Sequence, residues 1–82
     1  MLVLVGAVLL ATPASGATVE RRPTGYLEIC VRTEVREHPR PDSRAVYTLY
    51  VGNNANVFDY RGGWAKTNYP ARGWFLASAL CQ

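Results

Sequence analysis

The sequence predicts a small all-β domain in which five short strands form a partly open barrel. Apolar and polar residues alternate with the period of two that marks a strand with one buried face. Clusters of glycine, proline and asparagine separate these alternating segments, as turns do. No segment combines helix caps with a 3.6-residue apolar period. With 82 residues, the chain has room for one domain with a small core.

The first seventeen residues differ from the rest because they carry no charged side chain. The run from Leu2 to Ala11 is apolar apart from Gly6, about half of the roughly twenty residues that a membrane-spanning helix needs. Ser15 and Ala17 place small side chains where signal peptidase requires them, so we predict a signal peptide at residues 1–17, cleaved after Ala17. The alternatives are an uncleaved amphiphilic anchor and a buried element of the fold. Cleavage would leave an exported chain without stable membrane insertion.

The predicted mature chain begins with a polar segment. Residues 18–25 include a proline and a glycine, which predicts a flexible amino-terminal arm ahead of a domain at residues 26–82. The first strand is expected from Tyr26, and its alternation can continue as far as Val35.

Proline and glycine set the remaining boundaries. Pro39 and Pro41 exclude a helix from the charged segment 37–44, which we therefore expect to be a loop. The four further strands are expected at residues 45–51, 55–60, 64–69 and 73–76. A short connecting turn is expected at residues 77–79.

The two cysteines, Cys30 and Cys81, both lie in the predicted mature chain. An even number of cysteines in an exported chain favours a disulfide, and the alternative is two buried free thiols. The bond would close a loop of about 52 residues, for which the chain-entropy model gives about 4 kcal/mol. Cys30, Cys81 and the single histidine, His38, are the only soft ligands of the sequence. They are too few for the four ligands of a structural zinc site. We expect neither a metal nor a cofactor.

Short motifs follow one another in a fixed order between residues 31 and 80. They are Val35-Arg36, Pro39, Val46, Thr48-Leu49, Gly52, Ala55 with Val57, Gly62-Gly63-Trp64-Ala65-Lys66, Gly73-Trp74-Phe75 and Leu80. This ordered set resembles the bacterial SH3 (SH3b) family. The resemblance implies an SH3-like barrel whose first and last strands lie close together, which would bring Cys30 and Cys81 within reach of each other.

The resemblance also implies a function. Members of this family are commonly exported, non-catalytic modules attached to cell-wall hydrolases. We therefore expect a secreted SH3b module, extracellular and associated with the cell wall, that binds peptidoglycan or peptide ligands. The alternative is a small exported interaction subunit or inhibitor that docks on another extracellular protein.

Several other functions are not indicated. The nine basic and six acidic side chains are scattered, and a net charge of +3 does not single out nucleic acid. His38 lies in the predicted loop, where it is expected to be a solvated side chain. We expect no catalytic residues, no enzymatic activity and a monomeric chain.

Four aromatic residues are the candidate ligand contacts, namely Trp64, Tyr60, Tyr69 and Trp74. By resemblance, Trp64 corresponds to the tryptophan that forms the peptide groove of SH3 domains, with Tyr60 and Tyr69 as flanking residues. Alternatively, Trp64 covers one end of the core and Trp74 belongs to the core or the barrel rim. Leu76 and Ala79 stand where SH3 domains usually have a proline and a tyrosine. This departure predicts a different, shallower surface.

Overall fold

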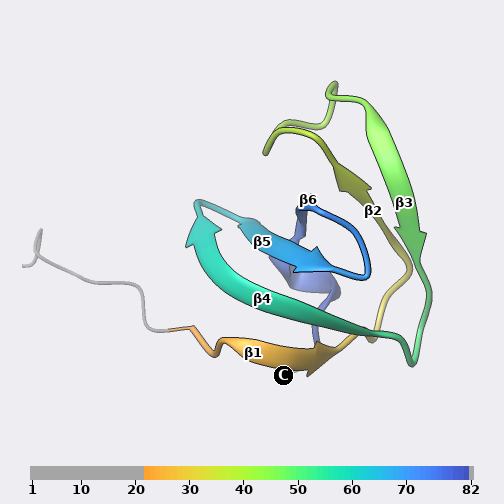
Figure 1. Cartoon of the computed structure of the whole chain (residues 1–82), viewed down its shortest axis with the longest axis vertical. Helices are drawn as coiled ribbons and strands as arrows, with labels where there is room; N and C mark the ends of the chain where they lie inside the picture. Colours follow the sequence, from red (N-terminus) through yellow and green to blue (C-terminus); the bar gives the residue numbers. More distant parts are fainter. Residues whose placement is uncertain (1–21, 82) are drawn as a thin grey trace, which may run out of the picture.

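The computed structural model describes residues 22–81, which form one antiparallel sheet of six strands that does not close into a cylinder (Figure 1). The strands are β1 (Gly25–Glu28), β2 (Thr33–Arg36), β3 (Ala45–Leu49), β4 (Asn54–Arg61), β5 (Trp64–Tyr69) and β6 (Gly73–Leu76). Their order is β1-β4-β5-β6-β2-β3, so β1 and β3 are the two end strands. A single 3-10 turn, η3 (Ala77–Ala79), follows β6.

The all-β class is confirmed, but the expected count of five strands is wrong. The first predicted strand, from Tyr26 towards Val35, is two strands, β1 and β2, separated at residues 29–32. The interruption has a tertiary cause, because the backbone N–H groups of Cys30 and Val31 both donate to the carbonyl oxygen of Ala79, at 2.8 and 3.1 Å. These hydrogen bonds take the chain out of line with β1 before β2 begins.

The other predicted elements agree closely with the structure. β4, β5 and β6 occupy the expected segments, and β3 ends at Leu49, two residues early. The turn at residues 77–79 is η3. β1 begins at Gly25, one residue before the predicted domain boundary. The predicted signal peptide and residues 18–21 of the predicted arm lie outside the described residues.

The core lies on one face of the curled sheet. It contains Ile29, Val35, Leu49, Ala55, Val57, Ala65, Phe75, Ala77 and Leu80. Alternation produces this arrangement: Ala65 pairs with Phe75 on the core face, so Lys66 and Trp74, which also pair, share the opposite face. The sequence pattern thus separates the two neighbouring aromatic residues of β6.

The charged segment 37–44 is a loop at the tip of the β2–β3 hairpin, as predicted. Its two ends are joined by a hydrogen bond from the Glu37 N–H to the Arg44 carbonyl oxygen at 2.9 Å. Ser43 is the buried residue of the loop; its hydroxyl accepts a hydrogen bond from the His38 N–H, and its carbonyl oxygen accepts one from Arg36. The loop therefore has a defined conformation.

The expected disulfide joins Cys30 to Cys81, with 4.9 Å between the two Cα atoms. It ties the segment between β1 and β2 to the residues after η3. Next to it, the Cys81 N–H donates to the Glu28 carbonyl oxygen at 2.9 Å. A disulfide of this kind persists in an oxidising environment. Between residues 22 and 81, no helix has the length and apolarity to span a membrane.

Candidate functional site

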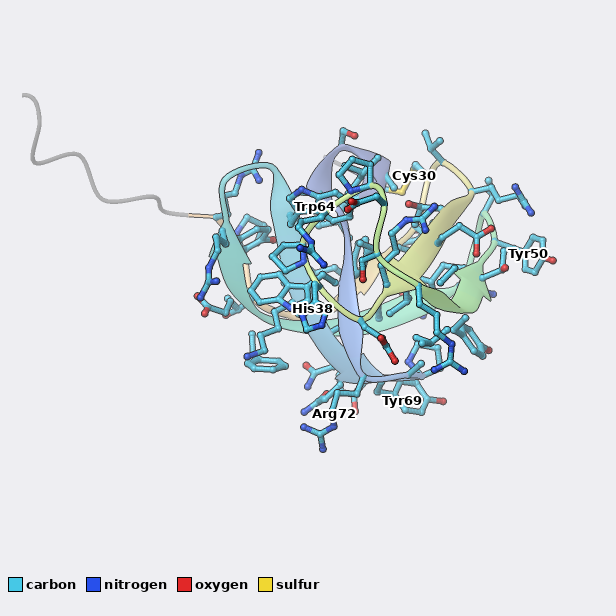
Figure 2. All side chains as sticks on the ribbon, turned by 90° about the horizontal axis from the view of Figure 1, so that it is seen from above. Cys30, His38, Tyr50, Trp64, Tyr69 and Arg72 are labelled. Atoms are coloured by element: carbon cyan, nitrogen blue, oxygen red, sulfur yellow. A yellow bond between two sulfur atoms is a disulfide. The ribbon has the colours of Figure 1, made fainter. Side chains whose placement is uncertain are left out.

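The four candidate ligand contacts lie on three neighbouring strands, with Tyr60 on β4, Trp64 and Tyr69 on β5, and Trp74 on β6. Trp64 begins β5 and Tyr69 ends it, and at 3.3 Å per residue their Cα atoms are about 16 Å apart. Figure 2 shows the two side chains at opposite sides of the domain. Trp64 and Tyr69 therefore do not lie side by side, and the role of the four residues as ligand contacts stays a prediction.

Tyr60 makes a structural contact. Its hydroxyl donates a hydrogen bond to the carbonyl oxygen of Pro23 at 2.7 Å, and the Arg22 guanidinium lies 5.1 Å from the centre of its ring. The half-buried ring also packs against the core. Tyr60 thus anchors the residues before β1 to β4.

Trp64 follows the tight turn between β4 and β5. Gly62 takes a positive φ of 57° there, which glycine adopts without steric cost. Trp64 is half-buried and lies opposite Arg61 on β4 and Leu76 on β6. It lines neither of the two hollows described next.

The first hollow is a cleft of about 490 Å³ lined by Tyr26, Tyr47, Gly52, Asn53, Asn54, Tyr69 and Pro70. We call it the tyrosine cleft. Its three tyrosines come from β1, β3 and the end of β5, and they remain 68%, 43% and 54% exposed. The rings of Tyr26 and Tyr69 meet edge to face with their centres 5.9 Å apart, which is a favourable aromatic geometry.

The sheet register brings Tyr26 and Tyr69 together. Asn56 of β4 lies opposite Tyr26 on one side and opposite Tyr69 on the other, and residues directly opposite each other share a face of the sheet. The buried Thr67 hydroxyl fixes the end of β5, because it donates to the Tyr69 carbonyl oxygen at 2.8 Å.

The turn after β3 forms the polar wall of the tyrosine cleft. Gly52 has a φ of 94°, and the Asn53 side-chain oxygen accepts a hydrogen bond from the Tyr50 N–H at 2.8 Å. This bond holds the turn in place. Among residues 22–81, no charged side chain lines the tyrosine cleft. Its surface of aromatic rings, amides and hydroxyls therefore suits neutral groups that have both an apolar face and hydrogen-bonding atoms.

The second hollow, of about 730 Å³, is lined by Glu37, His38, Val46, Lys66, Ala71, Arg72, Gly73 and Trp74. We call it the Trp74 pocket. Trp74 is only 6% exposed, yet it is not part of the core cluster. Two cationic side chains cover it instead: Lys66 Nζ lies 5.2 Å and Arg61 Cζ 5.3 Å from the centre of a Trp74 ring.

The Trp74 pocket has an excess of positive charge. Among the described residues that line it, Glu37 is the one carboxylate, and it is paired with Arg44, whose guanidinium nitrogen lies 3.0 Å from a Glu37 oxygen. Lys66 and Arg72 have no ion-pair partner among residues 22–81. Figure 2 shows Arg72 and Tyr69 at the same end of the domain. Tyr69 and Pro70 line the tyrosine cleft, whereas Ala71 and Arg72 line the Trp74 pocket. The turn at residues 69–72 therefore lies between the two hollows.

The sequence analysis named Tyr69 and Trp74 as candidate contacts but not Tyr26 and Tyr47, which line the tyrosine cleft together with Tyr69. The available signal was the abundance of tyrosine, five residues against two tryptophans and two phenylalanines, because tyrosine is common on recognition surfaces. The pattern along single strands could not show that β1 and β3 contribute to the same cleft.

No three residues among His, Cys, Asp and Glu in the described part of the chain are arranged to hold a metal ion. Comparisons with protein-family models, curated proteins and solved structures found no match to this chain.

Proposed function

We propose that this chain is an exported, non-catalytic binding module of the bacterial SH3 type that holds a peptide or glycan segment of the cell wall in its tyrosine cleft. The ordered motifs between residues 31 and 80, the all-β architecture and the Cys30–Cys81 disulfide support this proposal together. The disulfide favours an extracellular location because cytosolic conditions keep most thiols reduced.

The observation that carries the proposal is the gathering of three exposed tyrosines around one cleft. A small domain gains stability by burying its aromatic rings, yet these three remain open to water on separate elements. Exposed aromatic residues that converge on a hollow with a few polar groups are characteristic of ligand sites. Tyrosine combines a broad apolar ring with a hydroxyl and loses little side-chain entropy on binding.

The motifs that resemble the SH3b family lie at identifiable places in the sheet. The Gly62-Gly63-Trp64 motif forms the turn into β5, and Gly73-Trp74-Phe75 forms β6. The hairpin loop at residues 37–44 contains Pro39 of the motif set, and the 3-10 turn after β6 is followed by Leu80. We propose that the open six-stranded sheet is a variant of that barrel in which the disulfide ties the segment between β1 and β2 to the residues after η3.

The test compares retention of the disulfide-bonded protein on purified bacterial cell walls. Tyr26→Ala and Tyr69→Ala should each weaken retention about tenfold, as loss of a central aromatic contact does. Tyr50→Ala is the matched control, because Tyr50 is 55% exposed, close to the 54% of Tyr69, and lies outside the tyrosine cleft. It should bind as the unmodified protein does.

Two results would contradict the proposal. Absence of wall retention by the unmodified protein would remove the function altogether. Equal retention of Tyr69→Ala and Tyr50→Ala, combined with loss of retention in Trp64→Ala, would move the binding surface to the β4–β5 turn. Proton NMR spectra of each variant establish that it is folded before retention is compared.

A further inference from the structure

The two end strands of the sheet, β1 and β3 (Figure 1), differ in whether their outer edges have hydrogen-bond partners. The end of β1 is covered, because the Glu28 carbonyl oxygen accepts a hydrogen bond from the Cys81 N–H and the disulfide lies beside it. Between residues 22 and 81, β3 pairs with β2 alone. Its outer edge therefore presents unpaired backbone donors and acceptors, which is the template for adding another strand.

Consecutive residues of β3 line different hollows. Val46 lines the Trp74 pocket and Tyr47 lines the tyrosine cleft. Val35 of β2 pairs with Tyr47 and Arg36 pairs with Ala45, so Val46 is the extra residue of a β-bulge in β3. Val46 and Tyr47 are both partly exposed, at 38% and 43%. The free edge of β3 thus runs between the two hollows.

We propose that an extended peptide of the cell envelope binds as an added strand along the free edge of β3, with its side chains entering the tyrosine cleft and the Trp74 pocket alternately. This proposal rests on the proposed function, since it uses the same tyrosine cleft, and it selects peptide over glycan. A side chain of the added strand next to Val46 would enter the Trp74 pocket, and one next to Tyr47 would enter the tyrosine cleft. Backbone hydrogen bonds supply affinity and the two hollows supply selectivity.

The charges of the two hollows define the peptide. Lys66 and Arg72 line the Trp74 pocket without ion-pair partners in residues 22–81, so side chains on that side are acidic. The described residues that line the tyrosine cleft are all uncharged, so side chains on that side are apolar or hydroxyl-bearing. The occupant is therefore a strand in which acidic residues alternate with neutral ones.

The experiment uses the 15N-labelled, disulfide-bonded protein and three probes. The first is a blocked peptide, acetyl-Thr-Glu-Val-Glu-Val-amide. The second replaces both glutamates with lysine, and the third is a chain of N-acetylglucosamine units that contains no peptide. Amide shifts measure binding, and hydrogen exchange measures protection of the β3 amides that point away from β2.

We expect the glutamate peptide to protect β3 amides against exchange and to bind about tenfold more tightly than the lysine peptide. Equal affinity of the two peptides, or peptide binding without β3 protection, would overturn the inference. If only the glycan shifts resonances of the tyrosine cleft, the inference fails while the proposed function stands. If the glutamate peptide protects β3 but the protein is not retained on cell walls, the proposed function fails and strand addition stands.

Two side-chain substitutions test whether the cations of the Trp74 pocket select the glutamate peptide, and neither changes the backbone of the sheet. Lys66→Gln and Arg72→Gln should each reduce the preference for the glutamate peptide severalfold, because each removes one cation of the Trp74 pocket. Arg40→Gln is the control, since Arg40 lies in the hairpin loop beside Asp42 and outside the Trp74 pocket. An unchanged preference in both pocket variants would show that the pocket does not read charge.

Discussion

Lys66 and Trp74 lie directly opposite each other on β5 and β6, with the Lys66 Nζ 5.2 Å from the centre of a Trp74 ring. The same ammonium group lies 5.7 Å from the Phe58 ring. A cation held over an aromatic face is attracted by the ring's quadrupole. Trp74 is therefore shielded from water by a flexible charged side chain, where a core residue would be shielded by packed apolar atoms.

Removing Lys66 should uncover Trp74. In a Trp64→Phe background, which leaves Trp74 as the single tryptophan, Lys66→Ala should make its fluorescence more sensitive to quenching by acrylamide. It should also lower the free energy of unfolding by about 0.5–1 kcal/mol. Arg40→Ala in the same background is the control. Unchanged quenching would mean that atoms other than those of Lys66 keep water from the ring.

The disulfide should contribute a large part of the stability. It joins residues separated by 51 positions, and replacing both cysteines with alanine should cost about 4 kcal/mol through loop-closure entropy. Because Cys30 is exposed, the change should leave little cavity at that residue. Urea unfolding followed by circular dichroism measures the loss. A double variant as stable as the oxidised protein would contradict the chain-entropy account.

Gly73 should be intolerant of any side chain. A Cβ atom there would overlap the Arg36 carbonyl oxygen and lie 2.8 Å from Val35 Cγ1, at the point where β6 pairs with β2. Gly73→Ala should therefore destabilise the protein by about 1–3 kcal/mol. Gly63→Ala is the matched control, because its Cβ would meet no atom within 4 Å. Equal unfolding midpoints in urea for the two variants would disprove the close approach of β6 and β2.

The local pattern predicted the strands well where their partners are near in sequence. β4, β5 and β6 are joined by short turns at residues 62–63 and 70–72, so alternation and turn residues defined them. The break between β1 and β2 could not be predicted in this way. It depends on hydrogen bonds from Cys30 and Val31 to Ala79, a partner almost fifty positions along the chain.

The candidate site was harder to predict for the same physical reason. Tyr26 and Tyr47 belong to the two end strands of the sheet, and only the curled sheet brings them to one cleft with Tyr69. The emphasis on Trp64 came from a resemblance between motifs. Such a resemblance assigns a residue to a position in a fold, but the shape of the surface depends on neighbours such as Leu76, which lies opposite Trp64 on β6.

The two phenylalanines of the chain should respond very differently to truncation. Phe75 is fully buried on the core face of β6, whereas Phe58 is 45% exposed on β4. Phe75→Ala should cost about 3–5 kcal/mol, because it removes transfer free energy and leaves a cavity. Phe58→Ala should cost less than about 1 kcal/mol.

Urea unfolding of the oxidised variants measures both losses. Because Phe75→Ala could abolish folding in so small a domain, Phe75→Leu provides a milder variant that should cost about 1.5 kcal/mol or less and remain folded. Equal losses for Phe58→Ala and Phe75→Ala would show that Phe75 does not face the core. In that case the assignment of Ala65 and Phe75 to the core face of the sheet would be wrong.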